Sequence, residues 1–126
     1  MKNLLFIPLL VVCFMGYSQN PSTVIGKPIR IGKILVAQND FPKIMNWADA
    51  IAACENLGKG WRLPNKEELN ILFLNKDKIG GFETVASNYW SSTGDEERAW
   101  LQKITSGKQF YFLKYEQFHV RAIRTP

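Results

Sequence analysis

Residues 60–69 read GWRLPNKEEL, and this stretch decides how the chain is interpreted. Asn65 follows a proline and has Glu68 three positions later, the spacing of a capping box in which two free backbone amides are satisfied reciprocally. The sequence therefore predicts a helix that begins after Asn65, with an apolar face formed by Leu69, Leu72 and Phe73. The pattern fades over residues 75–78, and Gly80-Gly81 opens a loop.

A second helix is predicted upstream, where residues 46–58 read NWADAIAACENLG. Asn46 is a good N-cap, Asp49 stands where its carboxylate meets free amides, and Gly58 is expected to stop the helix. Steps of three and four place one apolar stripe along it, made of Trp47, Ala50, Ile51, Cys54 and Leu57. Cys54 is interpreted as a small buried hydrophobe, with redox or nucleophilic use as the alternative.

The remaining segments are typical of β structure. Ile29 to Val36 is predicted as a strand with a slip at Gly32-Lys33, either a bulge or a turn. After Gly81 the predicted strands are residues 89–93, 99–104, 109–113 and 119–124, separated by an acidic turn at 94–97, a hairpin turn at 106–107 and a turn at 114–117. Two helices packed on an antiparallel meander make an α+β domain.

The first 19 residues are predicted to be a secretory signal peptide. One lysine precedes an apolar run from Leu4 to Met15, which is short for a bilayer span, and small residues follow at Gly16 and Ser18. A lipoprotein acylated at Cys13 is the alternative. We therefore expect an exported protein that is secreted, periplasmic or attached to the cell surface, with no transmembrane segment after cleavage. Residues 20–30 form an N-terminal segment, and the domain proper is expected to span residues 31–126.

Five blocks in a fixed order identify the family that this chain resembles. They are MNWADA (45–50), GWRLPNKEEL (60–69), IGGF (79–82), YWSST (89–93) and VRAIR (120–124). Together they closely resemble the DUF1566 family, also called the C-terminal domain of the Legionella collagen-like adhesin, from about Ile31 to Arg124. The resemblance implies a fold similar to C-type lectins and formylglycine-generating enzymes, and binding of sulfated polysaccharides. Some members have a cysteine at the position of Ala122, paired with the Cys54 position; that bridge is impossible here, so an unpaired thiol is expected.

The family blocks also suggest structural roles. Trp61 and Trp90 are expected to be buried core residues. Arg62, Arg121 and Arg124 are candidates to pair with Glu67 and Glu68, because a guanidinium holds a carboxylate in a fixed geometry. The cluster is interpreted as a polar staple joining the second helix to the last strand, with a ligand cleft as the alternative.

The sequence contains few residues that could carry out enzymatic chemistry. The chain has one histidine, His119, and contains neither HExxH nor GxSxG. The reaction of formylglycine-generating enzymes is built on a cysteine pair in the C-terminal region, whereas no cysteine lies beyond Cys54. The acidic turn at residues 95–97 lacks the alternating ligand spacing of a calcium loop. No catalytic residue, metal or cofactor is therefore predicted.

The positive charge is concentrated in the last quarter of the chain. Residues 20–98 contain ten Lys/Arg and ten Asp/Glu, whereas residues 99–126 contain Lys103, Lys108, Lys114, Arg121 and Arg124 against Glu116 alone. Aromatic rings can stack on sugars and cations can meet sulfate groups, so the predicted ligand-binding residues are Lys103, Lys108, Tyr111, Lys114 and Tyr115. Strand alternation then requires Phe110 and Phe112 to face the core. The alternative is that edge lysines only prevent pairing between sheets.

These observations predict a secreted, non-catalytic recognition domain that binds an anionic or sulfated glycan or a cell-surface protein, and no nucleic acid. A degenerate enzyme of the formylglycine-generating kind and a structural envelope protein are the alternatives. The sequence does not indicate the oligomeric state.

Overall fold

The computed structural model describes residues 20–126, so the predicted signal peptide and the Cys13 alternative lie outside the described residues. In chain order the elements are α2 (Pro21–Ile25), β1 (Ile29–Ile31), β2 (Ile34–Val36), α3 (Trp47–Glu55), β3 (Trp61–Arg62), α4 (Lys66–Leu74), α5 (Lys76–Ile79), β4 (Asn88–Gly94), β5 (Arg98–Lys103), β6 (Gln109–Leu113) and β7 (Ile123–Arg124). The predicted α+β class is confirmed.

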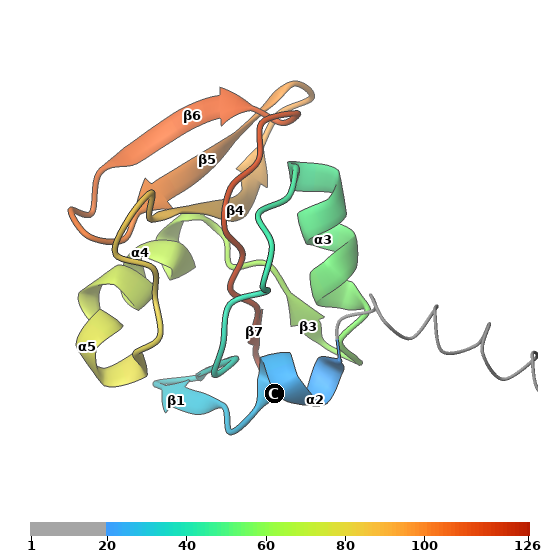
Figure 1. The fold of residues 1–126 in the computed structure, drawn as a ribbon, viewed down its shortest axis with the longest axis vertical. Coiled ribbons are helices and arrows are strands. Elements are labelled where there is room, and N and C mark those ends of the chain that lie inside the picture. The colour runs from blue at the N-terminus through green and yellow to red at the C-terminus, as the bar shows by residue number, and fades with distance from the viewer. Residues whose placement is uncertain (1–19) are drawn as a thin grey trace, which may run out of the picture.

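The strands form two antiparallel sheets. One has the strand order β1-β2-β7-β3, and the other is the meander β4-β5-β6. Figure 1 shows the meander at the top, with α3 and α4 on either side of the chain that descends to β7. The meander was predicted, whereas the first sheet was not, because β3 and β7 contain two residues each and carry no alternation of their own.

The first predicted strand is a hairpin, so the slip at Gly32-Lys33 is a turn. Ile31 pairs with Ile34, and Gly32 adopts a φ of 61°, which glycine tolerates without strain. The last predicted strand, residues 119–124, is largely wrong. His119 bridges in parallel to Tyr89, and only Ile123–Arg124 joins β2 and β3, because this segment passes from one sheet to the other.

Both main helices begin where the sequence places them. The side chain of Asn46 accepts a hydrogen bond from the Asp49 amide at 2.9 Å, which caps α3. α4 has the predicted capping box, in which Asn65 and Glu68 each accept the other's backbone amide. α3 ends at Glu55, before the predicted stop at Gly58, and the amide of Gly58 donates back to the Glu55 carbonyl.

The core lies between the two sheets and the two helices. Trp61, Trp90 and Cys54 share one cluster, in which Trp90 and Cys54 have no exposed surface and Trp61 is 8% exposed. The ring of Trp90 meets Phe118 edge to face at 4.9 Å, and its indole N–H donates to the Met45 carbonyl. The predicted burial of both tryptophans is confirmed. The thiol of Cys54 is also buried, and it forms no disulfide within residues 20–126.

Candidate recognition surface

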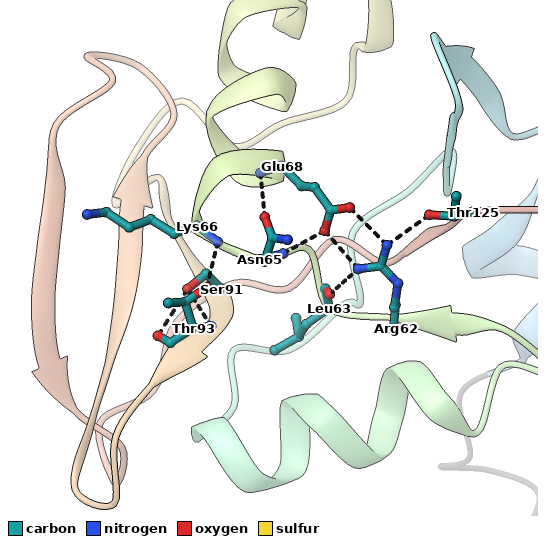
Figure 2. Close-up of polar contacts among 8 residues, drawn as sticks. All are labelled: Arg62, Leu63, Asn65, Lys66, Glu68, Ser91, Thr93 and Thr125. Atoms are coloured by element: carbon teal, nitrogen blue, oxygen red, sulfur yellow. Dashed lines mark hydrogen bonds and ion pairs between the residues drawn. The ribbon is translucent and has the colours of Figure 1, made fainter.

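A bidentate ion pair links β3 to the start of α4 (Figure 2). Arg62 donates from Nη1 to Glu68 Oε1 at 2.7 Å and from Nη2 to Oε2 at 2.9 Å. Arg62 also donates to the Thr125 hydroxyl, while Glu68 accepts the amide of Asn65. The Arg62 hydrogen bond lowers the pKa of Glu68. The predicted ion pair between the second helix and the last strand is therefore wrong: the pair joins α4 to β3, and Arg62 reaches the end of the chain only through Thr125.

Hydrogen bonds from residues 89–93 join the meander to the start of α4, next to the ion pair of Arg62 and Glu68. The Lys66 amide donates to the Thr93 hydroxyl at 2.8 Å, as Figure 2 shows, and Ser92 donates to the Pro64 carbonyl. Ser91 is fully buried, and its hydroxyl donates to the Trp100 carbonyl at 2.8 Å. Ser91 and Ser92 therefore serve as hydrogen-bonding residues of β4.

The predicted pairing of Arg121 with Glu67 or Glu68 is wrong. The Arg121 side chain has no exposed surface, and its Nε donates to Asp40 Oδ1 at 2.8 Å. The rest of its guanidinium donates to the carbonyls of Ala37 and Gly80. Asp40 is brought there by the loop before α3, which bonds to the segment around Val120. Because Arg121 is buried and its guanidinium N–H groups are already hydrogen-bonded, this side chain is not available to bind a ligand.

Tyr89 also belongs to the buried network of Arg121 and Asp40. The Tyr89 hydroxyl donates to Asp40 Oδ2 and accepts the Glu83 amide. Burial raises the pKa of Asp40, with Arg121 opposing that shift, and burial also raises the pKa of Tyr89. Arg124, the other arginine expected to pair with a glutamate, instead donates to the Lys59 carbonyl at 3.1 Å. Glu67 is exposed and forms no ion pair in the described part of the chain.

The five predicted ligand residues do not form one surface. Lys103 and Lys108 lie side by side at the β5–β6 hairpin, exposed and without an ion pair within residues 20–126. Lys114 is engaged, because its ammonium sits 3.8 Å from the centre of the Trp47 ring and donates to the Asp95 carbonyl. Tyr115 projects from the following turn and is 72% exposed.

Tyr111 lies on the opposite face of the sheet from the lysines. Alternation along β6 places Lys108, Phe110 and Phe112 together, and the Lys108 ammonium lies 5.6 Å from the Phe110 ring centre. Phe110 packs against the core as predicted, but Phe112 is 42% exposed, so the expectation that both phenylalanines face the core is only half right. β6 is the edge strand, and nothing from the rest of the described chain covers Phe112 fully.

The face of Tyr111 carries an aromatic pair that sequence reasoning missed. Trp100 stands directly across from Tyr111, with ring centres 4.9 Å apart and a tilt of 32°. Both rings are partly exposed, and the Lys66 ammonium lies 3.7 Å from the Trp100 ring centre. Pairing residues outward from the Ser106-Gly107 turn would have placed Trp100 beside Tyr111. We call Trp100 and Tyr111 the aromatic platform.

A carboxylate and an arginine border the aromatic platform. The Tyr111 hydroxyl donates to Asp95 Oδ2 at 2.5 Å, and Oδ1 accepts the amides of Glu97 and Arg98. The Tyr111 hydrogen bond is the main cause that lowers the pKa of Asp95 to about 2. The Arg98 side chain is exposed on the same face, two residues before Trp100 on β5.

The surface also has two hollows away from the meander faces. One of about 310 Å³ lies beside the Gly80–Thr84 loop, and one of about 370 Å³ runs along α3 past Ala52 and Ala53. Neither contains a predicted ligand residue. In residues 20–126, no group of three His, Cys, Asp or Glu side chains could hold a metal ion. Over the same range no helix is both long and apolar enough to cross a membrane.

Comparison with known proteins agrees with this architecture. A family model described as the Lcl C-terminal domain matches residues 29–124. The snake venom toxin convulxin is similar in structure, with 15% identity, a TM-score of 0.62, and coverage of 80% of this chain and 96% of that one. Botrocetin gives 13% identity, a TM-score of 0.60 and coverage of 80% and 98%. These are C-type-lectin-like snake venom proteins, so the fold is C-type-lectin-like. No curated protein matches the sequence.

Proposed function

Because the chain belongs to the Lcl C-terminal domain family, we propose that it is an exported, non-catalytic recognition domain that binds an anionic glycan on the aromatic platform. The observation that carries the proposal is the stacked, partly exposed pair of Trp100 and Tyr111 with cations and a carboxylate at its border. Such convergence of apolar rings with a few fixed polar groups is typical of ligand sites.

Each group at the platform has a part in this proposal. The rings offer flat apolar area to the C–H face of a sugar. Asp95 stays ionised at physiological pH because its pKa is about 2. A carboxylate offers roughly four acceptor positions, and three are taken by Tyr111, Glu97 and Arg98, so one is open to a sugar hydroxyl.

Arg98 is placed to meet a sulfate or carboxylate group on the glycan. The ammonium of Lys66 would meet such a group by leaving the face of the Trp100 ring, from whose centre it lies 3.7 Å. Lys66 and Arg98 form no ion pair with any side chain of residues 20–126. Charge-assisted hydrogen bonds to such anions are stronger than neutral ones. Lys103 and Lys108 lie on the other face, so in this proposal they attract the polymer through space and do not touch the bound sugar.

Non-catalytic function is supported by the state of the reactive side chains. Cys54 is fully buried and its burial raises the pKa of the thiol to about 12, so the nucleophilic thiolate is absent at neutral pH. His119 packs its ring on Tyr89, with centres 5.4 Å apart. Neither side chain is placed for the chemistry of a formylglycine-generating enzyme.

The test compares two double variants that remove the same charge from opposite faces. Affinity for dextran sulfate is measured by calorimetry for Lys66→Ala with Arg98→Ala, and for Lys103→Ala with Lys108→Ala. Losing two direct charge-assisted contacts should weaken binding at least about a hundredfold in the first variant, since each contributes roughly 1.5–3 kcal/mol. The second should weaken it only about twofold, and that loss should disappear at high salt.

Two outcomes would contradict the proposal. Equal losses in the two double variants would mean unspecific attraction, and a larger loss from the hairpin pair would move the site to the other face. Trp100→Ala adds a separate check, because binding should fall even though no charge changes.

Protein recognition is a second candidate. Phe112 and Tyr115 are exposed aromatic residues, a kind of side chain that is enriched at protein interfaces. Botrocetin is also known in complex with the A1 domain of von Willebrand factor, in a structure with 13% identity to this chain and a TM-score of 0.56. Failure of every glycan tested, together with retention of a surface protein, would favour this candidate.

A further inference from the structure

The ammonium group of Lys66 covers part of the aromatic platform. It lies 3.7 Å from the centre of the Trp100 ring, in the position of a cation–π contact. Figure 2 shows the Lys66 side chain extended from the start of α4 toward the meander. The Tyr111 ring takes up space beside the same indole, with its centre 4.9 Å away. A sugar that stacks on the covered face of Trp100 therefore has to displace the ammonium.

The backbone of Lys66 is held in place, whereas its side chain is free to move. The Lys66 amide donates to the Thr93 hydroxyl at 2.8 Å, and the Lys66 carbonyl accepts from the Gln109 side chain at 3.3 Å. Within residues 20–126 the ammonium forms neither an ion pair nor a hydrogen bond, so its contact with the Trp100 ring is what holds it. Lysine carries its charge on a flexible four-carbon stem. The ammonium can therefore leave the ring without any change of the backbone.

Lys114 provides a comparison with a lysine that is held more firmly. Its ammonium lies 3.8 Å from the centre of the Trp47 ring and also donates to the Asp95 carbonyl. A ligand that displaced Lys114 would have to break both contacts. Because Lys66 has no such second contact in the described part of the chain, it is the more easily displaced of the two lysines.

The cost of displacing the Lys66 ammonium depends on the charge of the sugar. A cation–π contact at an exposed site contributes about 0.5–1 kcal/mol, which is about twofold to fivefold in an equilibrium constant. A neutral sugar that takes over the ring face loses this factor and gives the ammonium no new partner. A sulfate or carboxylate on the sugar accepts a charge-assisted hydrogen bond from the displaced ammonium, which more than offsets the loss. The covered ring therefore discriminates against neutral sugars.

We propose that Lys66 is a specificity-determining residue of the aromatic platform, whose ammonium covers Trp100 and leaves it for a sulfate or carboxylate group on a sugar. This inference rests on the proposed function, since it requires that a glycan stacks on Trp100. Specific sites combine a favourable contact to the right ligand with a penalty against the wrong one. Here one lysine supplies both.

The test compares two polymers that differ only in sulfation, dextran and dextran sulfate. Lys66→Ala removes both the cover and the charge, so affinity for dextran should rise about twofold to fivefold, while affinity for dextran sulfate should fall about tenfold. Lys66→Met removes the charge but keeps a flexible side chain that contacts aromatic rings, so its affinity for dextran should stay close to that of the parent. Retardation on a column of cross-linked dextran measures the weak binding of the neutral polymer.

Two controls separate the cover on Trp100 from other effects of removing a lysine. The Lys76 ammonium lies 4.7 Å from the centre of the Phe73 ring, so Lys76→Ala removes the same charge and the same kind of contact without uncovering Trp100. This variant should bind dextran as the parent does. Lys66→Ala should also leave dextran binding unchanged in a Trp100→Ala background, because the ring that it uncovers is then absent.

The outcomes distinguish this inference from the function on which it rests. Unchanged dextran affinity in Lys66→Ala, with dextran sulfate still bound through Trp100, would refute the role of Lys66 and leave the proposed function intact. A rise in dextran affinity that persists in the Trp100→Ala background would also refute it, since the uncovered surface would then lie elsewhere. No binding of dextran sulfate by the parent would overturn the proposed function and this inference with it.

Discussion

Replacing Arg121 by alanine tests the buried network that joins the last segment to the loop before α3. The substitution removes the only ion-pair partner that Asp40 has among the described residues, and it leaves the carbonyls of Ala37 and Gly80 without the guanidinium donors. The guanidinium also lies 4.2 Å from the centre of the Phe82 ring, so packing is lost as well.

The expected loss follows from the contacts. Breaking a buried ion pair by removing one partner costs about 3–5 kcal/mol, and each buried acceptor left unpaired costs about 1–3 kcal/mol. These costs overlap, because Asp40 is 11% exposed and water can enter the space that arginine vacates. We therefore expect the free energy of unfolding at pH 7 to fall by about 4 kcal/mol, a large part of the roughly 5–15 kcal/mol typical of a domain.

The loss should also depend on pH. Burial already raises the pKa of Asp40, and without Arg121 that pKa rises further. A carboxyl whose folded pKa lies above its unfolded value of 3.8 stabilises the fold at low pH and loses that contribution as pH rises through the folded pKa. The difference between variant and parent should therefore shrink as pH falls from 7 toward 4.

Urea denaturation followed by tryptophan fluorescence measures this directly, since Trp61 and Trp90 report the core. Arg124→Ala is the matched control on the same segment. Its side chain makes one hydrogen bond, to the Lys59 carbonyl, and should cost about 1 kcal/mol or less. If the Arg121 and Arg124 variants unfold within about 0.5 kcal/mol of each other, which is the usual effect of an unimportant surface change, the network reasoning is wrong.

Three further predictions follow from single sites. Cys54 should not react with a thiol reagent in the native protein and should react once in denaturant, because it is buried with a pKa near 12; rapid native labelling would contradict this. The parent should lose stability as pH falls below about 4.5, because the Arg62 hydrogen bond lowers the pKa of Glu68, and Glu68→Gln should flatten that part of the pH profile in urea titrations. Gly94→Ala should lower the melting temperature by several degrees, since a Cβ there would lie 2.3 Å from the Arg98 carbonyl oxygen; an unchanged melting temperature would mean that the hairpin shifts freely.

The features that the sequence predicted correctly are those fixed by near neighbours. Asn46 and Asn65 cap their helices through amides three residues away, so the local pattern contains both partners. Burial of Cys54 follows from helical periodicity within a single element. The meander was also readable, because each turn joins strands that are adjacent in the chain.

The features that the sequence did not predict depend on long separations. Arg121 and Asp40 are 81 positions apart, and neither residue type nor spacing distinguishes Asp40 from the glutamates of α4. The same holds for β7, whose partners β2 and β3 come from distant parts of the chain. Two-residue strands of this kind form because of the packing around them. They are too short to show a period-two pattern, so they cannot be predicted from the local sequence.

The charge excess of the last quarter shows why a count of residues could not locate a ligand site. Arg121 is neutralised by Asp40 inside the core, and the cation of Lys114 rests on the Trp47 ring. The exposed lysines of that quarter that form no ion pair among residues 20–126 are Lys103 and Lys108. They lie on the face of the sheet opposite the aromatic platform. Segregated charge in a sequence therefore indicates attraction for anions in general. A contact surface requires the strand register, and the register brings together Trp100 and Tyr111, which carry no charge at neutral pH.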